Sequence, residues 1–580
     1  MHKLLRYLNK KQIFSCIAVI VLLFIQANGE LALPDYMSKI VSEGIGQNNL
    51  DNIYKYGAIM LLISLMITAC AIMVGFLAAR TAAQLSRTLR IKIFSKVESF
   101  SNTEFDKFST ASLITRSTND IQQIQMFFVM LLRMIFFAPV MGAGGIVRAI
   151  TKSREMPQMT VIIIIGVITL LVMLFTLLKL TIPKFKIIQK LIDRLNLVTR
   201  EQLTGLMVIR AFNTEAHERE RFDDANTVLT NNNLSVFRTM ALMHPIMSLI
   251  MNGVSVAVIW VGAYLISDVT DLANVMAFMQ YAMHIIMSFL FISMAFMQWP
   301  RASVSTERIR EIIETEIIVK DPENPVSSED FGKTGVIEFK NVCFKYTGAD
   351  EYTLENISFT AKPGETTAFI GSTGSGKSTL INLVPRFYDV SEGSITIDGI
   401  DIRNVTQKDL RNIIGYIPQK GILFTGDINS NLKYSDENAQ NEDILKAAEV
   451  AQALDFIEKM PDKLNSEIAQ GGSNVSGGQK QRLSIARALV KKPQIYIFDD
   501  SFSTLDFKTD AKLRKALKEY TQNATVLIVA QRINTIMNAE QIVVLDEGKV
   551  VGIGTHKQLL KECEVYRDIA LSQLSKEELQ

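Results

Sequence analysis

The chain has 580 residues and a net charge of +2, and 48% of its residues are hydrophobic while 21% are charged. This length allows several domains, and so balanced a charge gives no indication of nucleic-acid binding. The cysteines are far apart and form no CxxC pair, which argues against a zinc site or a disulfide framework and favours reduced packing residues. They are Cys16, Cys70, Cys343 and Cys563.

Long apolar stretches recur through the first half of the chain. Each approaches or exceeds the ~20 residues that a helix needs to cross a bilayer. The stretches are Phe14–Met37, Ile59–Leu77, Phe127–Val147, Met159–Leu180, Pro245–Ile266 and Val275–Met297. Basic residues precede the first stretch, as in a signal peptide, but five further stretches follow and no A-x-A cleavage pattern is found. We therefore predict six retained membrane-spanning helices.

The basic residues predict the orientation of these spans. The loop between the first and second spans has only Lys39 and Lys55, and the loop between the fifth and sixth has none. By contrast, the loop between the second and third spans contains Arg80, Arg87, Arg90, Lys92, Lys96, Lys107 and Arg116. Both chain ends and the long loops are therefore predicted to be cytoplasmic. One short outer loop, with Lys152 and Arg154, departs from this pattern.

Two of the predicted cytoplasmic loops have a helical pattern. Residues 108–125 and 203–222 mix apolar residues with charge, and we predict helices that continue from the spans into the cytosol. These helices are either simply solvated or form a mechanical contact with a following domain.

Two features inside the spans have a functional and a structural interpretation. Glu30 and Asp35 lie in the first span, where charge is costly and usually functional. They contact a cationic substrate or lie in water near the outer end of the helix. Methionines at helical spacing on the sixth span suit a soft binding surface or ordinary helix packing. They are Met276, Met279, Met283 and Met287.

The composition becomes polar after the sixth span, and residues 312–330 contain two prolines. We predict a membrane domain at 1–311, a linker at 312–335 and a second domain at 336–580. Residues 336–346 alternate between apolar and polar, as in a half-buried strand. Residues 366–384 then give an apolar strand, a glycine-rich loop and a helix.

The glycine-rich loop has the spacing of a phosphate-binding loop, G-x-x-x-x-G-K-[ST]. Such a loop directs backbone N–H groups at phosphate oxygens beside a helix N-terminus. Lys377 is predicted to reach the β- and γ-phosphates of ATP, and the Ser378 hydroxyl is predicted to ligate Mg²⁺. The predicted ATP-binding residues here are Gly371, Ser372, Thr373, Gly374, Ser375, Gly376, Lys377, Ser378 and Thr379.

The sequence IYIFDDSFSTLD at 495–506 predicts a buried parallel strand that ends in carboxylates. Nucleotide-binding sheets place metal-binding and catalytic acids at this edge, so Asp499 is predicted to serve the metal. The next residue is the natural base for a water molecule. It is Asp500 rather than the longer glutamate.

The stretch NVSGGQKQRLSIARAL at 474–489 resembles the signature of ABC transporters, with Ser476, Gly477, Gly478 and Gln479 in place. With six spans ahead of it, the whole chain resembles an exporter-type ABC half-transporter. The resemblance implies a membrane α-helical bundle with long cytoplasmic extensions, followed by a cytoplasmic α/β nucleotide-binding domain. It also implies that the two helical loops are coupling helices, the second of which reaches the ATPase domain of the partner.

The resemblance assigns further roles in the nucleotide-binding domain. Tyr346 is expected to stack on adenine, and Gln419 to sense Mg²⁺ and contact the membrane half. The metal set is then Ser378, Gln419 and Asp499. The loop from Ser503 to Asp506 is expected to face the partner subunit.

Two residues depart from the family pattern. Asp500 stands where a glutamate orients the attacking water, and Gln531 stands where a histidine is usual. Aspartate is shorter by one C–C bond, roughly 1.5 Å, and losing a general base typically costs ~10²–10⁴-fold in rate. Glutamine can donate a hydrogen bond to the γ-phosphate but cannot titrate. ATP binding is therefore expected to survive, while hydrolysis is expected to be slow.

The intact signature acts in trans in this family, on the ATP of the partner. We therefore expect a heterodimer, similar to asymmetric bacterial multidrug exporters, in which the partner supplies the missing glutamate and histidine. The expected location is the bacterial plasma membrane, and the expected substrate is a hydrophobic small molecule. The alternatives are a homodimer, a lipid or peptide exporter, an ATP-binding regulatory subunit and an ATP-gated channel.

Overall fold

The structure is a computed structural model that describes residues 6–152, 157–327 and 331–574. It divides into two compact units. The first unit runs to Glu98 and resumes at Ala111–Glu314, and the second consists of Ser99–Thr110 and the chain from Thr315 onward. The short segment 99–110 was assigned to the membrane domain from the sequence, but it belongs to the second unit because it packs there.

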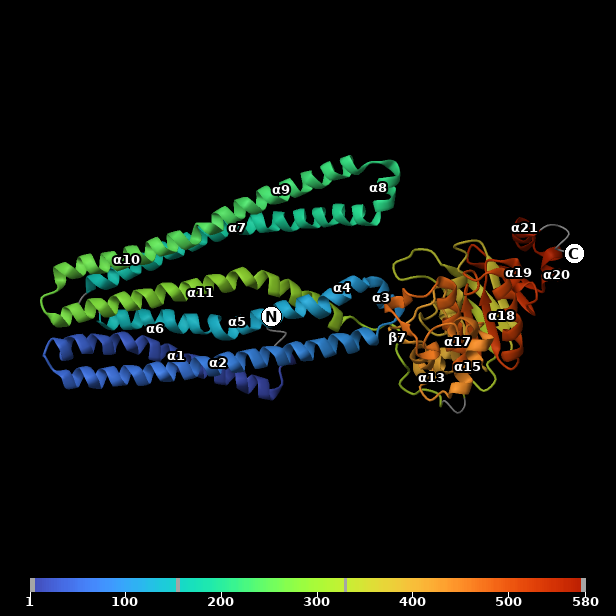
Figure 1. The fold of residues 1–580 in the computed structure, drawn as a ribbon, viewed down its shortest axis with the longest axis horizontal. Helices are drawn as coiled ribbons and strands as arrows, with labels where there is room; N and C mark the ends of the chain where they lie inside the picture. Colours follow the sequence, from blue (N-terminus) through green and yellow to red (C-terminus); the bar gives the residue numbers. More distant parts are fainter. Residues whose placement is uncertain (1–5, 153–156, 328–330, 575–580) are drawn as a thin grey trace. The chain divides into compact units, whose positions relative to one another are not determined.

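The first unit is a bundle of long helices (Figure 1). Among the described residues, six helical stretches are long and apolar enough to cross a membrane: Lys10–Ile45, Leu50–Glu98, Thr110–Lys152, Pro157–Thr204, Glu215–Leu265 and Val269–Glu314. Five of them contain the corresponding predicted apolar stretch and extend beyond it, and the fifth in chain order contains all of its predicted stretch except Ile266. The prediction of a six-helix membrane domain is confirmed, whereas Arg154 of the short outer loop lies outside the described residues.

The helices of this unit have the following bounds: α1 (Lys10–Lys39), α2 (Leu50–Glu98), α4 (Thr110–Thr115), α5 (Ile121–Met130), α6 (Phe137–Lys152), α7 (Pro157–Thr204), α8 (Leu206–Phe212), α9 (Glu215–Ala241), α10 (Met243–Leu265) and α11 (Val269–Glu314). π-helical turns extend α1 and connect α4, α5 and α6: Ile40–Ile45, Arg116–Asp120 and Leu131–Ile135. Helices α1, α6 and α11 pack together around a small buried cluster: Ala27, Leu31, Met141, Ala277 and Tyr281.

The two loops that we predicted to be cytoplasmic are helical, but the second is interrupted twice. Residues 108–125 enter a helical run that continues through α4 and α5. Residues 203–222 contain the end of α7, the short α8 and the start of α9. Asn213 adopts a left-handed conformation with φ 57° and ends α8. As a result, α8 is a short helix between two long ones.

The second unit is an α/β domain with two main sheets. The strands are β1 (Ile337–Phe344), β2 (Leu354–Ala361), β3 (Thr366–Gly371), β4 (Glu392–Ile397), β5 (Ile400–Asp401), β6 (Ile414–Ile417), β7 (Gly426–Asp427), β8 (Glu467–Ile468), β9 (Ile495–Asp499), β10 (Thr525–Val529), β11 (Gln541–Asp546) and β12 (Lys549–Gly554). The helices are α3 (Asn102–Lys107), α12 (Lys377–Leu383), α13 (Gln407–Asn412), α14 (Ile428–Lys433), α15 (Asn441–Val450), α16 (Leu454–Ile457), α17 (Gly477–Val490), α18 (Phe507–Tyr520), α19 (Ile533–Ile536), α20 (His556–Glu562) and α21 (Glu564–Gln573).

The larger sheet has six strands in the order β12-β11-β3-β10-β9-β6, and all neighbours from β11 to β6 are parallel. Its central strands β3, β9, β10 and β11 are buried on both faces, because alternate residues enter two different apolar cores, whereas the edge strand β12 is partly exposed. Phe498 belongs to one core, while Ile495 and Ile497 belong to the other. All five residues of β9 are buried, which confirms the predicted parallel strand.

The smaller sheet has the order β2-β1-β4-β5. The half-buried strand predicted at 336–346 is β1, but its alternation shifts by one residue after Phe339. The shift coincides with Asn341, whose φ is 47°, and it is the effect of a β-bulge.

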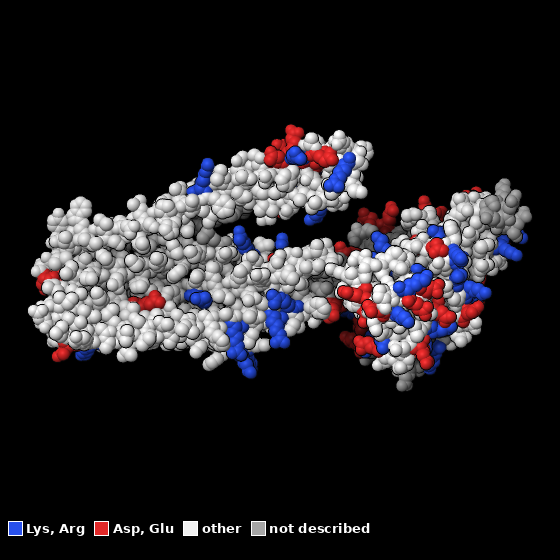
Figure 2. Space-filling model, in the orientation of Figure 1, with Lys and Arg blue, Asp and Glu red and all other residues white. Residues whose placement is uncertain are grey.

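Figure 2 shows few charged side chains along most of the helical unit and many of both signs over the α/β unit.

Candidate functional site

The phosphate-binding loop connects the C-terminal end of β3 to the N-terminus of α12. Gly376 has a φ of 92°, and a Cβ there would lie 2.6 Å from Leu354 Cδ2, so only glycine fits. Lys377 Nζ donates to the carbonyl oxygens of Gly371 at 2.9 Å and Ser372 at 2.6 Å. Burial lowers the pKa of Lys377, and the charges of two nearby aspartates oppose that effect. The loop therefore places a cation beside the helix N-terminus, where phosphates bind.

The predicted metal ligands lie at the junction of this loop with β9. Ser378 Oγ donates to Asp499 Oδ1 at 2.8 Å. Burial raises the pKa of the Asp499 carboxyl, and the hydrogen bond from Ser378 partly offsets it. A hydroxyl oxygen and a carboxylate oxygen at this separation fit Mg²⁺, which prefers hard oxygen ligands and completes its octahedron with phosphates and waters.

Asp500 accepts two side-chain hydrogen bonds on the same oxygen atom. Gln531 Nε2 donates to Asp500 Oδ2 at 2.8 Å, and Gln419 Nε2 donates to it at 3.2 Å. Asp500 is buried and has a φ of 45°, a left-handed conformation that aspartate tolerates better than most residues. The structure thus brings together the two residues that depart from the family pattern, and it places Gln419 on Asp500.

Tyr346 lies beside α12, next to the C-terminal end of the phosphate-binding loop. Its hydroxyl is 2.9 Å from Thr379 Oγ1 on α12, and its ring packs edge-on against Tyr388 at 5.4 Å. The Tyr388 hydroxyl in turn donates to Asp106 Oδ2 on α3 at 3.0 Å. Burial and the carboxylate of Asp106 raise the pKa of Tyr388. The aromatic residue expected at adenine is therefore linked to the segment between the second and third spans.

Sequence reasoning missed α3 and its contact with Tyr388, because the first helical loop was taken to begin at residue 108. A signal for α3 was present. Ser101 and Glu104 form a capping box, with Glu104 Oε2 accepting from Ser101 N at 2.6 Å. This S-x-x-E pattern marks the start of a helix.

The signature residues begin α17. Ser476 is the N-cap, and its hydroxyl accepts from Gln479 N at 3.3 Å. A Cβ added to Gly477 would have no atom within 4 Å, and one added to Gly478 would make only ordinary contacts. Packing within this chain therefore does not explain the two glycines. Ser503 Oγ donates to the carbonyl oxygen of Asp500 at 2.8 Å, and Asp506 is the N-cap of α18.

Comparison with known proteins follows the same division of the chain. Residues 16–289 match the family described as the ABC transporter transmembrane region, and residues 354–503 match the family described as ABC transporter. A protein of Mycobacterium tuberculosis named as an uncharacterized ABC transporter ATP-binding protein is 40% identical over 559 residues, covering 96% of this chain and 95% of that protein. The chain belongs to the ABC transporter family.

Other relatives fit this assignment. The ABC transporter ATP-binding protein YfiB of Bacillus subtilis is 37% identical over 578 residues, covering 100% of this chain and 99% of that protein. The ATP-dependent lipid A-core flippase of Desulfotalea psychrophila is 33% identical over 495 residues, covering 83% of each. The structure of a bacterial Atm1-family ABC exporter with ATP bound has a TM-score of 0.80 at 25% identity, covering 98% of this chain and 99% of that one.

This ABC transporter chain is therefore an exporter-type half-transporter with a six-helix membrane domain and an ATP-binding domain. The family couples ATP hydrolysis to transport, its half-transporters act as dimers in a lipid bilayer, and the bacterial relatives support a multi-pass plasma-membrane protein. The predictions of an ABC half-transporter and of its two-part fold are confirmed.

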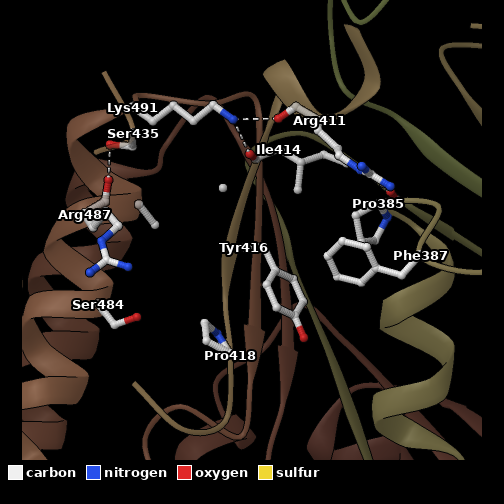
Figure 3. Close-up of a pocket in the computed structure, with 12 residues that line it drawn as sticks. Pro385, Phe387, Arg411, Ile414, Tyr416, Pro418, Ser435, Ser484, Arg487 and Lys491 are labelled. Carbon is white, nitrogen blue, oxygen red and sulfur yellow. Dashed lines mark hydrogen bonds between the residues drawn. The ribbon is translucent and has the colours of Figure 1, made fainter. Parts of the chain in front are cut away.

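A separate pocket of about 260 Å³ lies in the ABC domain beside the edge strand β6 (Figure 3). Its apolar and aromatic walls include Phe387, Ile414 and Tyr416. Its cations are Arg411, Arg487 and Lys491, and none forms an ion pair within the described part of the chain. They donate instead to uncharged oxygens. Lys491 Nζ donates to the carbonyl oxygens of Arg411 at 2.6 Å and Ile414 at 2.8 Å, and the two arginines donate to backbone carbonyl and side-chain amide oxygens. Burial lowers the pKa of all three groups.

In the membrane domain, the residues that the sequence marked as possible substrate contacts have different surroundings. Asp35 accepts hydrogen bonds from Arg148 and from the Tyr281 hydroxyl, so its charge is balanced within the chain. Glu30 accepts from Gln26 Nε2 at 3.0 Å and has no ion-pair partner among the described residues. The methionine stripe also divides, because the members toward the chain's C-terminus are exposed and the other two are partly buried. Exposed fractions are 48% for Met283 and 42% for Met287, against partial burial for Met276 and Met279.

Proposed function

We propose that this chain is one half of a heterodimeric exporter for hydrophobic or amphipathic compounds, and that its own site mainly holds ATP. Both chain ends lie in the cytoplasm. ATP closes the two nucleotide-binding domains on each other, the cytoplasmic helices transmit this closure, and the cavity between the spans turns outward. Hydrolysis at the site of the partner then resets the transporter.

The observation that carries the proposal is the pairing of Asp500 with Gln531. A general base must accept a hydrogen bond from the water that it activates. Asp500 Oδ2 already accepts from Gln531 and Gln419, and the side chain is roughly 1.5 Å shorter than glutamate. Gln531 cannot take up or release a proton. The site therefore has a short, already hydrogen-bonded carboxylate at one position and a non-titrating amide at the other, which supports slow hydrolysis.

The rest of the site supports ATP binding. Lys377 serves the β- and γ-phosphates, and Tyr346 stacks on adenine. Gln531 has two amide hydrogens, one of which goes to Asp500 while the other is directed to the γ-phosphate. Bound Mg²⁺, held by Ser378 and Asp499, neutralises phosphate charge.

The signature supports a role in trans. Glycine removes a side chain where a ligand approaches the backbone closely, yet Gly477 has open space around its Cβ position within this chain. The ligand that needs this space is therefore the ATP held by the phosphate loop of the partner. The loop from Ser503 to Asp506 contributes to the same interface.

Two contacts carry the mechanical coupling in this proposal. Within the second unit, Asp106 of α3 accepts a hydrogen bond from Tyr388, which connects the first coupling loop to the nucleotide-binding domain.

Helix α8 has no buried residue, and its exposed apolar side chains are Leu206, Met207, Val208 and Phe212. We assign the pocket beside β6 to the helix of the partner that corresponds to α8, with α8 itself entering the equivalent pocket of the partner.

The proposed substrate is a hydrophobic drug-like compound with a cationic group, because Glu30 is the carboxylate of the first span that has no cation partner among the described residues. A lipid is the second candidate. It is favoured by the similarity to a protein named as a lipid A-core flippase.

The test uses the complex purified from its native membrane through a tag on this chain. Gly477→Ala fits the isolated fold but obstructs the ATP of the partner, so we expect it to abolish most turnover. Lys377→Ala affects only the weak site and is expected to retain most turnover. Equal losses in the two variants would indicate two equivalent sites, as in a homodimer. Turnover that no hydrophobic compound or lipid stimulates would contradict the exporter substrate assigned here.

A further inference from the structure

The C-terminal helix α21 ends against the loop that carries Gln531. Gln573 Nε2 donates to the carbonyl oxygen of Gln531 at 2.8 Å. In the same side chain, Gln573 Oε1 accepts from the backbone N–H of Ile533 at 2.8 Å. One amide group thus bonds the backbone on both sides of Arg532.

This loop is short and has few other restraints. It joins the end of β10 at Val529 to the start of α19 at Ile533. Arg532 donates to the carbonyl oxygen of Ser503 at 3.2 Å and lies 4.9 Å from the centre of the Phe507 ring. These contacts hold the side chain of Arg532, whereas Gln573 holds the backbone that sets the direction of Gln531.

Helix α21 is itself fixed to the domain. Tyr566 is fully buried, and its hydroxyl is 2.7 Å from Nδ1 of the buried His556 on α20. Ala570 is also fully buried, one turn before Gln573. Because both anchors lie on the buried face of α21, the helix is a firm support from which Gln573 reaches the loop.

We propose that Gln573 is a positioning residue for the nucleotide site. It fixes the backbone at Gln531 so that the Gln531 amide stays on Asp500 and presents its second hydrogen to the γ-phosphate. The C-terminal helix thereby sets how strongly this site prefers ATP to ADP, because only ATP has the phosphate that Gln531 contacts. This inference rests on the role of Gln531 proposed above.

The test measures equilibrium binding of MgATP and MgADP to the purified full chain in lipid nanodiscs, at a temperature where turnover is negligible. Removing a net hydrogen bond from the loop is expected to weaken ATP binding about three- to tenfold in Gln573→Ala, with ADP binding unchanged. Gln573→Glu keeps the acceptor for Ile533 but places a carboxylate against the carbonyl of Gln531, so it should lose at least as much.

Ser572→Ala is the matched control. Ser572 is the neighbouring exposed residue of α21, and its hydroxyl donates to the carbonyl oxygen of Ile569 at 2.7 Å. It should bind both nucleotides like the wild type. Hydrogen exchange provides a second readout that does not depend on nucleotide. The Ile533 amide should exchange faster in Gln573→Ala than in Gln573→Glu, because only the latter retains its acceptor.

The decisive comparison adds Gln573→Ala to Gln531→Ala. If Gln573 acts through Gln531, the double variant has the same ratio of ATP affinity to ADP affinity as Gln531→Ala alone. Equal weakening of ATP and ADP by Gln573→Ala, or a further loss in the double variant, would overturn the positioning role. If Gln531→Ala itself leaves the ratio at the wild-type value, the γ-phosphate contact proposed above fails, and this inference fails with it. A lowered ratio in Gln531→Ala, with a wild-type ratio in Gln573→Ala, would instead remove only the role of Gln573.

Discussion

If the site mainly holds ATP, as proposed, restoring the usual acid–base pair should convert it into a hydrolytic one. The change is Asp500→Glu together with Gln531→His. In the wild type, one oxygen of Asp500 accepts from Gln531 at 2.8 Å and from Gln419 at 3.2 Å. Glutamate moves the carboxylate by roughly 1.5 Å, which is about half of either hydrogen-bond distance. The longer side chain therefore breaks these two hydrogen bonds and brings the base closer to the phosphate loop.

The expected gain follows from the value of a positioned general base, ~10²–10⁴-fold. We expect about 10²-fold in kcat, the lower end, because the residue retains the left-handed backbone with φ 45° at position 500. Glutamate tolerates that conformation less well than aspartate, and a left-handed residue costs roughly 1–2 kcal/mol. A slightly lower Tm should therefore accompany the gain in rate.

The assay is ATP turnover by this chain alone in lipid, for the wild type, each single variant and the double variant. Native mass spectrometry gives the fraction of dimer, so that each rate is expressed per dimer, in which every site meets the intact signature of the other copy. Adding Lys377→Ala to the double variant should remove the gained turnover. Brisk hydrolysis by the wild type alone would refute the reasoning, since Asp500 would then be an adequate base.

Three further predictions concern single side chains. Asp500→Asn should raise the thermal stability of the nucleotide-free protein at pH 7. Burial raises the pKa of the Asp500 carboxyl, against hydrogen bonds from Gln419 and Ser503, so the charged form opposes folding at neutral pH. This gain should vanish as the pH falls toward about 4, and a gain that is constant with pH would contradict it. Tyr346→Ala should weaken ATP binding at least fivefold, from about 1–3 kcal/mol of base stacking, while Tyr346→Phe retains most affinity in the same binding assay. Arg148→Leu should destabilise the protein in detergent by about 1–2 kcal/mol, below the value for a fully buried pair, because the side chains of Arg148 and Asp35 are 29% and 32% exposed. Adding Asp35→Asn should recover part of the lost Tm, and no recovery would mean that Asp35 does not depend on Arg148.

The sequence by itself determined the architecture. Apolar stretches of about 20 residues predicted the six spans, because a helix of that length crosses the bilayer and satisfies all of its backbone hydrogen bonds internally. The spacing from Gly371 to Ser378 located the phosphate loop, because converging backbone N–H groups need glycines at those positions. The buried strand ending at Asp499 followed from an uninterrupted apolar run, since both faces of a parallel strand are covered.

Only the tertiary structure decided which distant side chains meet. From the sequence, Asp35 is an unpaired carboxylate in a span. In the structure it forms an ion pair with Arg148, which lies more than a hundred residues away in the chain. No local pattern relates Asp106 to Tyr388 or Gln573 to Gln531, because these pairs come from segments that meet only after the domain has packed. Residue type and spacing determine local structure and the chemistry available at each position. Hydrogen bonds between remote segments depend on packing, and they set the surroundings of Asp500.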